Sequence, residues 1–547
     1  MALRWPWGRN GVALAGLPDN PRIDLQPAGA HNPANMRVRI LVVIAVCAAV
    51  IAAAQTGPLQ TAPRSLSLQQ CIQLALNHNL DVQIERLSAG IAGFNLGAAY
   101  GAYDPTFSFS AKHAYVAEPG GFDARKFNPY FPDQLTTDTL GSALTGLAPI
   151  GLSYNFGGRV GTESANTDFN SDSDDASFFP GGIRRTNDGF ADLGVTVTQH
   201  LLKDFWIDQS REVIRVRRKE LKMSEQAMRF QIMRIMLAVE VGYYDLIAAR
   251  EEVRVQEKAL ELRQQFVAET HRRVEVGDLP PLDAEQAETQ LQITLTALTT
   301  ARQVYVARQN ALKVLLTEDF REWVDSDLLP TDALLALPAE LNRSVSFQKA
   351  LLDRPDLAES RLAVEKSDVV VQFRRNQLYP SLDFVGRYAG LGIDQGGNSA
   401  LNDAINFGNP EYFYGVVVSF PVTRTAERNY YRASQAAKQL AQLQLKKAEQ
   451  AVFLEIADWV NRVQSGFMQV GSTHKARVYA EAALAAEQKK LQNGLSTSFF
   501  VLQLQETLTT ARTTEALALA DYNKALAQLA FAEGSTLEKR NLKLEVK

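Results

Sequence analysis

The sequence has few of the residues that build metal centres and disulfide frameworks. Of its 547 residues, two are cysteine (Cys47 and Cys71) and six are histidine, and the histidines are scattered without the spacing of metal ligands. A zinc cluster or a disulfide-rich scaffold needs several such residues at short, regular spacings. The composition therefore predicts no metal site, no structural disulfide and no bound cofactor.

Motifs of enzyme active sites are missing as well. The chain contains no P-loop, no dinucleotide-binding fingerprint and no G-x-S-x-G element. Neighbouring carboxylates such as Glu251 and Glu252 fall in strongly helical stretches, where they are typical of a solvated helix face. We therefore expect a protein that is not an enzyme and has no catalytic residues.

Long hydrophobic runs and an excess of positive charge are also lacking. There are 57 Lys and Arg against 61 Asp and Glu, a net charge of −4, which argues against a general nucleic-acid binder. The only long apolar run lies near the N-terminus, which excludes a polytopic helical membrane protein. A β-barrel is compatible with the average composition, which is 46% hydrophobic, because alternating strands barely change it.

The apolar run is a predicted secretory signal peptide at residues 36–54. It begins with Arg37 and Arg39, continues through an apolar core and ends in three alanines before Gln55, as a cleavage site does. Residues 1–35 are expected to be a non-native or mis-assigned N-terminal extension. The alternative to a signal peptide is a retained N-terminal helix.

The rest of the chain contains an internal repeat. Three pairs of segments match: LSLQQCIQLALNHNLDVQIERL (66–87) with VSFQKALLDRPDLAESRLAVEK (345–366), AAYGAYDPTFSFSA (98–111) with RNQLYPSLDFVGRY (375–388), and RVEVGDLPPLDAEQAETQL (273–291) with KLQNGLSTSFFVLQLQETL (490–508). A tandem duplication explains all three matches. The predicted repeats comprise residues 55–330 and 331–547.

The first repeat is longer than the second between matched positions. Pro105 and Pro380 are 275 residues apart, whereas Gly277 and Gly494 are 217 residues apart. The first repeat therefore carries an insertion of 58 residues between its proline and its glycine.

Both repeats contain period-2 alternation, which predicts β-strands. We expect a β-hairpin with a long loop at 105–205 and a second hairpin at 380–421, four strands in all. Aromatic residues near the strand ends, such as Tyr412 and Tyr414, favour a lipid-facing barrel over a half-buried soluble hairpin. Within the long loop, the alternating segment PIGLSYNFGGRVG would extend the first hairpin as extra strand.

A long helix follows each hairpin. No proline occurs from Ile207 to Glu275 or in the 126 residues after Pro421, and apolar residues recur there with coiled-coil spacing. A helix of about 65 residues is about 100 Å long. Each long helix is expected to turn at a glycine-containing loop and return as a helix about half as long. Shorter helices at 67–97 and 344–376 would cover the remaining half.

In this order the motifs resemble the TolC-type outer-membrane efflux protein family. The resemblance is carried by the helix openings LSLQQCIQLALNHN and VSFQKALLDRPDL, the strand entry LYPSLDF, the segments VTVTQHLLKDF and VEVGYYDLIAAREEV, and the paired glycine turns. It covers nearly the whole chain after the signal peptide. His200 stands where the family usually has proline, and Asp104 replaces the apolar residue before the strand proline.

The resemblance implies a mainly α fold with a membrane β part. Long antiparallel coiled-coil helices would form a trimeric α-barrel across the periplasm, and four strands per protomer would enter a shared β-barrel of about twelve strands in outer-membrane lipid. Two hairpins alone cannot satisfy their edges in lipid, which supports a homotrimer. The implied function is a passive export duct that docks a periplasmic adaptor and an inner-membrane pump, in tripartite efflux or type I secretion.

The resemblance also implies two groups of functional residues. The tips of the helix turns would contact the adaptor, although a left-handed helix cap also explains both glycines. The tunnel entrance of the family carries acidic residues, but Phe500 and Gln503 occupy two of those positions, and only Asp283 in the first repeat is acidic. We therefore expect an aromatic constriction at Phe500; the alternative is a phenylalanine packed between helices. The predicted adaptor contacts are Val276, Gly277, Asp278, Leu279, Asn493, Gly494, Leu495 and Ser496.

Two other functions fit parts of the pattern. A non-transporting periplasmic coiled-coil scaffold or adhesin would explain the long helices, but it has no use for aromatic-ended strands that face lipid. A pump adaptor would need a small β-rich module that interrupts a single helical hairpin, and the sequence shows no such module. An outer-membrane channel of a diderm bacterium is therefore the leading interpretation.

Overall fold

The computed structural model gives the fold of the compact unit that runs from Ala62 to Lys547. The predicted signal peptide, the extension before it and the tip residue Asp278 lie outside the residues that the structure describes. The described residues are 64–117, 119, 121–123, 128–130, 134–169, 182–277, 279–540 and 542.

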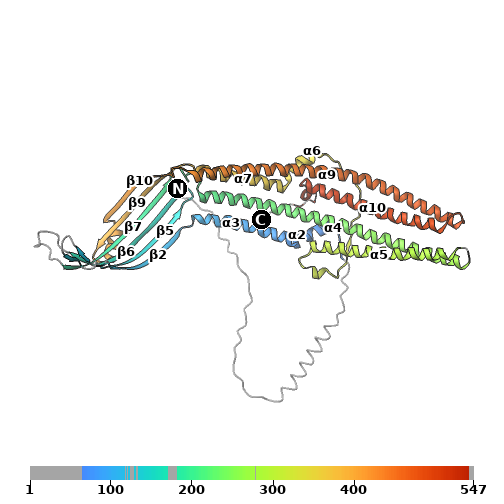
Figure 1. Cartoon of the computed structure of the whole chain (residues 1–547), viewed down its shortest axis with the longest axis horizontal. Helices are drawn as coiled ribbons and strands as arrows, with labels where there is room; N and C mark the ends of the chain where they lie inside the picture. Colours follow the sequence, from blue (N-terminus) through green and yellow to red (C-terminus); the bar gives the residue numbers. More distant parts are fainter. Residues whose placement is uncertain are drawn as a thin grey trace, which may run out of the picture. The chain divides into compact units, whose positions relative to one another are not determined.

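Most of this unit is helical, and the same succession of helices occurs twice (Figure 1). Two helices precede the strands, a long helix follows them, and a helix about half as long returns. In the first half these are α2 (Leu68–His78), α3 (Leu80–Tyr100), α4 (Gln209–Glu275) and α5 (Pro281–Leu316). In the second half they are α6 (Arg343–Asp353), α7 (Pro355–Asn376), α9 (Thr425–Gln492) and α10 (Ser498–Ala532). Shorter elements are η1 (Gly101–Tyr103), η2 (Phe320–Trp323), α8 (Gly397–Ile405) and α11 (Thr536–Lys539).

The two long helices, α4 and α9, have the lengths that the sequence predicts, with 67 and 68 residues. Next to the strands, α4 contacts α3 and α7, and α7 contacts α9. Away from the strands, α4 contacts α5 and α10, and α10 contacts α9. The helices therefore form two rows of four, one next to the strands and one away from them, and the long helices run through both rows (Figure 1).

The hydrophobic core around the middle of α4 follows the coiled-coil spacing of this helix. Ile232, Met236, Val239, Tyr243 and Leu246 are buried and pack against α2, α5 and the short strands near them. Residues three and four positions apart lie on one face of a helix, so this spacing forms a continuous apolar stripe. The stripe holds the long helix against its shorter neighbours.

The short helix pairs are broken at positions with clear local causes. Asn79 ends α2 and caps α3, because its side chain accepts hydrogen bonds from the backbone N–H groups of Asp81 and Val82. In the second half the break falls at Arg354, which precedes Pro355 and is therefore disfavoured in a helical conformation. The buried Arg354 guanidinium is paired with Asp356 at 2.8 Å.

The main sheet has six antiparallel strands, so the expectation of four strands is wrong. The two additional strands, β5 and β6, form a hairpin between β2 and β7, and β6 contains the alternating part of PIGLSYNFGGRVG. The sequence hides β5 because threonine and glycine occupy many of its positions and weaken the apolar alternation. The strands, in spatial order, are β10 (Asn409–Ser419), β9 (Ser381–Asp394), β7 (Gly182–His200), β6 (Leu152–Phe169), β5 (Gln134–Leu147) and β2 (Thr106–Ala117).

Two small strand pairs lie outside the main sheet. Strand β1 (Arg64–Leu66) pairs in parallel with β8 (Leu328–Pro330), and β3 (Gly121–Asp123) pairs with β4 (Asn128–Tyr130). The first pair joins the start of the described chain to the segment between its two halves.

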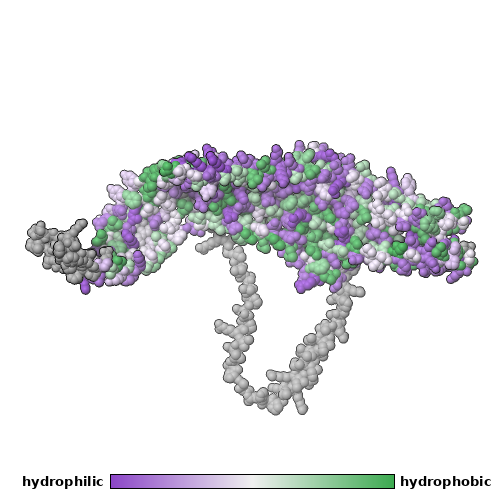
Figure 2. All heavy atoms as spheres, in the orientation of Figure 1, coloured by the Kyte–Doolittle hydropathy of each residue, from purple (hydrophilic) through white to green (hydrophobic). Residues whose placement is uncertain are grey.

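The pairing register gives the main sheet two different faces. Directly paired residues share a face, and successive residues alternate between faces. Hydrophobic residues remain exposed on this sheet (Figure 2). The apolar face carries Phe107, Phe109, Leu140, Leu144, Phe156, Val195, Tyr388, Tyr412, Tyr414 and Val416. The polar face carries Ser108, Ser110, Lys112, Asn155, Arg159, Asp192, Thr196 and Arg387.

The short helix α8 packs on the apolar face where three glycines leave room for it. A Cβ atom on Gly392 would lie 1.8 Å from the carbonyl oxygen of Ala400 in α8, and one on Gly390 would lie 2.1 Å from that of Ala404. Gly189 of β7 is equally close to the start of α8. The glycines therefore allow helix and sheet backbones to touch, and Ala400 and Ala404 are fully buried there.

We expect Gly392→Ala to destabilise the sheet by about 1–3 kcal/mol, because the added methyl group must displace the backbone of α8. The measurement is thermal unfolding of the purified protein in detergent. Gly415→Ala in β10 is the matched control, since a Cβ there meets no atom within 4 Å. Equal melting temperatures for the two variants would contradict the close contact between α8 and β9.

Candidate functional site

The far ends of the helices form two tips, α4–α5 and α9–α10. Gly277 and Gly494 adopt left-handed conformations, with φ of +79° and +71°. The N–H of Gly494 donates to the Leu491 carbonyl at 3.1 Å, and the N–H of Leu495 donates to that of Lys490 at 2.9 Å. These bonds close the helix end as a glycine cap does, so the helix-cap interpretation of the glycines is confirmed.

Each tip also presents an apolar side chain to solvent. Val276, which precedes Gly277, is 74% exposed, and Leu495, which follows Gly494, is 77% exposed. Leu279 and Ser496 are half-buried, whereas Asn493 is exposed. An exposed apolar residue at the end of a rigid hairpin is suited to contact with another protein.

The second tip is held in shape by a polar contact. The Ser496 hydroxyl donates to a carboxylate oxygen of Glu487 at 2.6 Å, and the Lys490 ammonium lies 2.9 Å from the other oxygen. Ser496 and Lys490 lower the pKa of Glu487 because both favour its ionised form. The loop is thereby tied to the last turns of α9.

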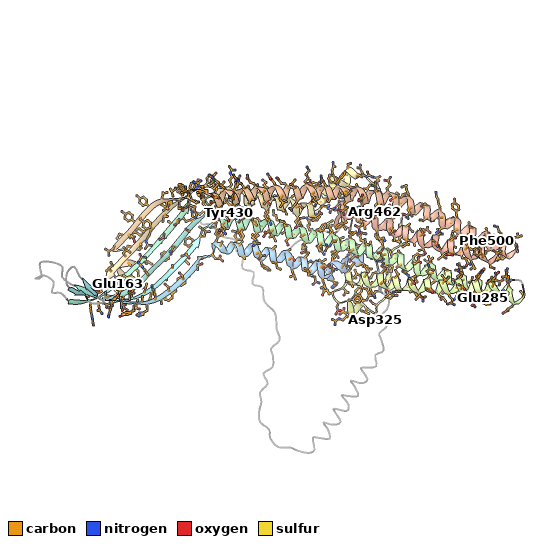
Figure 3. The ribbon with its side chains drawn as sticks, viewed as in Figure 1. Glu163, Glu285, Asp325, Tyr430, Arg462 and Phe500 are labelled. Carbon is orange, nitrogen blue, oxygen red and sulfur yellow. The ribbon has the colours of Figure 1, made fainter. Side chains whose placement is uncertain are left out.

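Two neighbouring phenylalanines lie in the first turn of α10, just past this tip. Phe499 is 61% exposed and Phe500 is 51% exposed, and their rings meet edge to face with centroids 5.7 Å apart. Figure 3 shows Phe500 near the end of the hairpin. The helices of the same chain leave Phe500 largely uncovered, and the exposed Gln503 lies one turn further along.

The third predicted entrance residue, Asp283, belongs to the other hairpin. It lies in the first turn of α5 and is half-buried. Phe500 and Gln503 are thus close together in sequence and structure on α10, whereas Asp283 is on the neighbouring tip.

A buried arginine that the sequence did not single out joins the two hairpins near their tips. Arg263 of α4 donates to the backbone carbonyl of Leu502 in α10 at 3.3 Å, and its other terminal nitrogen, Nη1, has no hydrogen-bond partner among the described residues. Burial lowers the pKa of this guanidinium, while the nearby Glu506 partly offsets the effect. No signal in the sequence distinguishes it from a charged residue on a helix surface, because its cover comes from α10 of the other hairpin.

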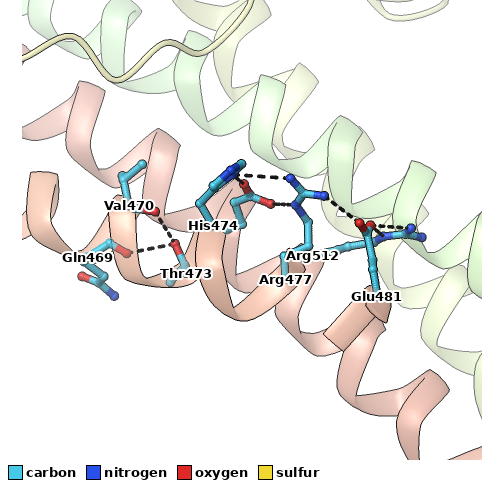
Figure 4. A network of polar contacts seen from close by, with 8 residues as sticks. Gln469, Val470, Thr473, His474, Arg477, Glu481 and Arg512 are labelled. Carbon is cyan, nitrogen blue, oxygen red and sulfur yellow. Dashed lines mark hydrogen bonds and ion pairs between the residues drawn. The ribbon is translucent and has the colours of Figure 1, made fainter. Parts of the chain in front are cut away.

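A charged network links α9 to α10 further from the tip (Figure 4). Glu481 accepts from Arg512 at 2.9 Å and from Arg477 at 3.1 Å. Arg477 also pairs with Glu515, which lies 2.7 Å from His474. Arg512, followed by Arg477, lowers the pKa of Glu481, so the network is fully formed at neutral pH.

Neither a metal site nor a membrane-spanning helix is found in the part of the chain that the structure describes. These residues contain no group of three or more His, Cys, Asp or Glu side chains placed to hold a metal ion. Among the same residues, no helix combines the length and the apolar character that crossing a membrane requires.

Comparison with known protein families supports the resemblance found in the sequence. The family described as outer membrane efflux protein matches residues 165–318 and 347–535, more than half of the chain. This match confirms the predicted family. No curated protein sequence matches the chain.

Solved structures with the same fold include outer-membrane channels. The CmeC outer membrane channel of Campylobacter jejuni has a TM-score of 0.62 and 15% identity, over 87% of this chain and 90% of that chain. The outer membrane protein VceC from Vibrio cholerae has a TM-score of 0.59 and 16% identity, over 85% and 96%. The open state of the Neisseria gonorrhoeae MtrE outer membrane channel has a TM-score of 0.57 and 15% identity, over 86% and 89%.

We expect the Glu481 network to make the α9–α10 hairpin more stable at neutral than at acid pH. The folded-state pKa of Glu481 is depressed, so its contribution is present above the ordinary glutamate value of 4.5 and is lost as the pH falls through the folded-state value. Glu481→Gln should therefore lower the melting temperature at pH 7, and the difference from wild type should shrink as the pH falls toward 3.

The measurement is thermal unfolding of wild type and variant at both pH values. Glu285→Gln on α5 is the control, because this exposed glutamate side chain forms no ion pair among the described residues. A pH-independent difference between Glu481→Gln and wild type would show that the network is not electrostatic in origin.

Proposed function

Because the chain belongs to the outer membrane efflux protein family, we propose that it is the exit duct of an export system that spans both membranes of a diderm bacterium. It is an outer-membrane protein with a periplasmic extension. The observation that carries the proposal is the direct connection of a two-faced sheet to helices about 100 Å long. The sheet suits a membrane wall around a polar lumen, and the helices suit a tunnel.

The duct is a homotrimer. Among the described strands, none pairs with the outer edge of β2 or of β10, so the sheet of one chain is open on both sides. Unpaired backbone groups are too costly in hydrocarbon for an open edge to persist there. Further copies of the chain provide the missing partners, and three copies make a ring of twelve helices from each row of four.

Docking to a periplasmic adaptor takes place at the two helix tips. Val276 and Leu495 are the exposed apolar anchors, and the glycine caps hold them at the ends of rigid hairpins. The adaptor joins the duct to an inner-membrane pump, and the pump supplies the energy for efflux or type I secretion. The exposed Phe500 narrows the tunnel entrance beside these tips.

A periplasmic scaffold or adhesin fits the structure less well. Such a protein would keep its long helices in water, but it would gain nothing from an apolar sheet face with exposed residues such as Phe107, Tyr412 and Tyr414. A sheet in water turns polar side chains outward, whereas a sheet in lipid turns apolar ones outward. The apolar face therefore favours the channel over the scaffold.

Cell fractionation combined with chemical crosslinking tests the proposal. We expect the full chain in the outer-membrane fraction, crosslinked as a trimer. An abundant outer-membrane porin and a soluble periplasmic protein serve as fraction controls. Recovery as a monomer in the soluble periplasmic fraction would contradict the channel function.

We expect Phe500→Ala to raise single-channel conductance in planar lipid bilayers, because three large side chains would leave the narrowest part of the tunnel. Phe499→Ala is the matched control, since it removes the same group one position earlier, about 100° around the helix. An unchanged conductance for Phe500→Ala would remove this residue from the constriction. Equal increases for both variants would make the constriction a property of the aromatic pair.

A further inference from the structure

The two open edges of the main sheet are complementary to each other. Strands alternate in direction from β2 through β5, β6, β7 and β9 to β10, so the first and last strands of the sheet run in opposite directions. When β10 of one copy lies beside β2 of the next, the antiparallel alternation continues without interruption. An uninterrupted antiparallel barrel requires an even number of strands from each chain, and the six strands of this sheet meet that requirement.

The stagger between the strands has the size that a closed barrel needs. The residue pairs across the sheet connect Thr106, the first residue of β2, to Phe413 in β10. Phe413 lies six positions before Ser419, the last residue of β10. Six residues correspond to about 20 Å along a strand, and five strand spacings to about 24 Å across the sheet. The strands are therefore tilted by about 40°, within the range of closed barrels. The register passes through Thr106, Thr145, Asn155, Thr196, Arg387 and Phe413.

Six strands also match the width of the helix row to which they connect. The row next to the strands contains α3, α4, α7 and α9. Four helices packed side by side at about 9 Å span about 36 Å. Six strands with a tilt of about 40° span about 38 Å, whereas four would span only about 25 Å. Six strands can thus continue the wall of the helical tunnel without narrowing it.

We propose that all six strands enter the barrel, so that the trimer forms an eighteen-stranded pore rather than one of twelve. The inference rests on the proposed trimeric channel and adds the β5–β6 hairpin to its wall. The family match begins at residue 165, so β2, β5 and most of β6 lie outside the matched segments. Barrel diameter grows in proportion to strand number, so the pore is about 1.5 times as wide as a twelve-stranded one.

The polar face of the sheet lines this wide pore with charges of both signs. Arg387 is paired with Asp192 at 2.6 Å, and Arg159 and Lys112 project from the same face. Strands in barrels of sixteen to eighteen members surround an aqueous channel. The barrel therefore admits bulky, hydrated cargo and leaves size selection to the tunnel entrance.

Cysteine crosslinking tests the contact between copies. Continued for one more strand, the stagger places Gly415 of β10 opposite Ser110 or Lys112 in β2 of the neighbouring copy, with all three on the polar face. We expect Gly415→Cys combined with Ser110→Cys or Lys112→Cys to give disulfide-linked dimers and trimers after oxidation. Gly415→Cys with Ala111→Cys is the matched control, because Ala111 lies between them on the opposite face. Failure of both test pairs to link would overturn the proposed edge contact.

Cryo-electron microscopy of the full chain in lipid nanodiscs counts the strands directly. Eighteen strands in a trimer would confirm the inference. Twelve strands, with β5 and β6 outside the ring, would overturn it while leaving the trimeric channel intact. Particles without a shared barrel would overturn both the inference and the proposed function, so the two failures are distinguishable.

Discussion

The structure depends on one constraint, the need to satisfy backbone hydrogen bonds where water is absent. A sheet with an apolar face can lie in lipid only when its edges are paired. The described strands leave β2 and β10 with open outer edges, so in the proposed channel further copies of the chain would complete the sheet. The helices meet the same constraint without a partner, because each forms its backbone hydrogen bonds within itself. A helix can therefore lie in water or pack against a neighbour.

Much of the helical part could be predicted from the sequence because its signals are long and repeated. The absence of proline over α4 and α9, the heptad spacing of residues such as Ile232 and Met236, and the glycines at both turns each point to the same hairpins. The family could be predicted from the order of these weak motifs. The tip residues follow from their positions beside the glycines.

The sheet and the buried contacts were harder to predict for physical reasons. Strand β5 pairs on both sides, so threonine and glycine are tolerated and its alternation is faint. The packing of α8 on Gly390 and Gly392 depends on a contact that only the folded sheet creates. Arg263 looks like an ordinary helix-surface residue, yet α10 covers it, because a helix from the other half of the chain packs there.

The long helices connect the membrane end of the molecule to its tips. Since α4 and α9 belong to both helix rows, neither row can shift along them without moving the other. Polar bonds tie the two halves together along this length: Lys524 to Asp245 at 2.8 Å, and Arg540 to the buried Glu240 at 2.7 Å. Removing the Arg540 guanidinium would leave the buried Glu240 carboxylate without this partner, which is more costly than losing a surface ion pair. In the proposed channel, a partner bound at the tips would therefore be linked to the sheet end through the same two continuous helices.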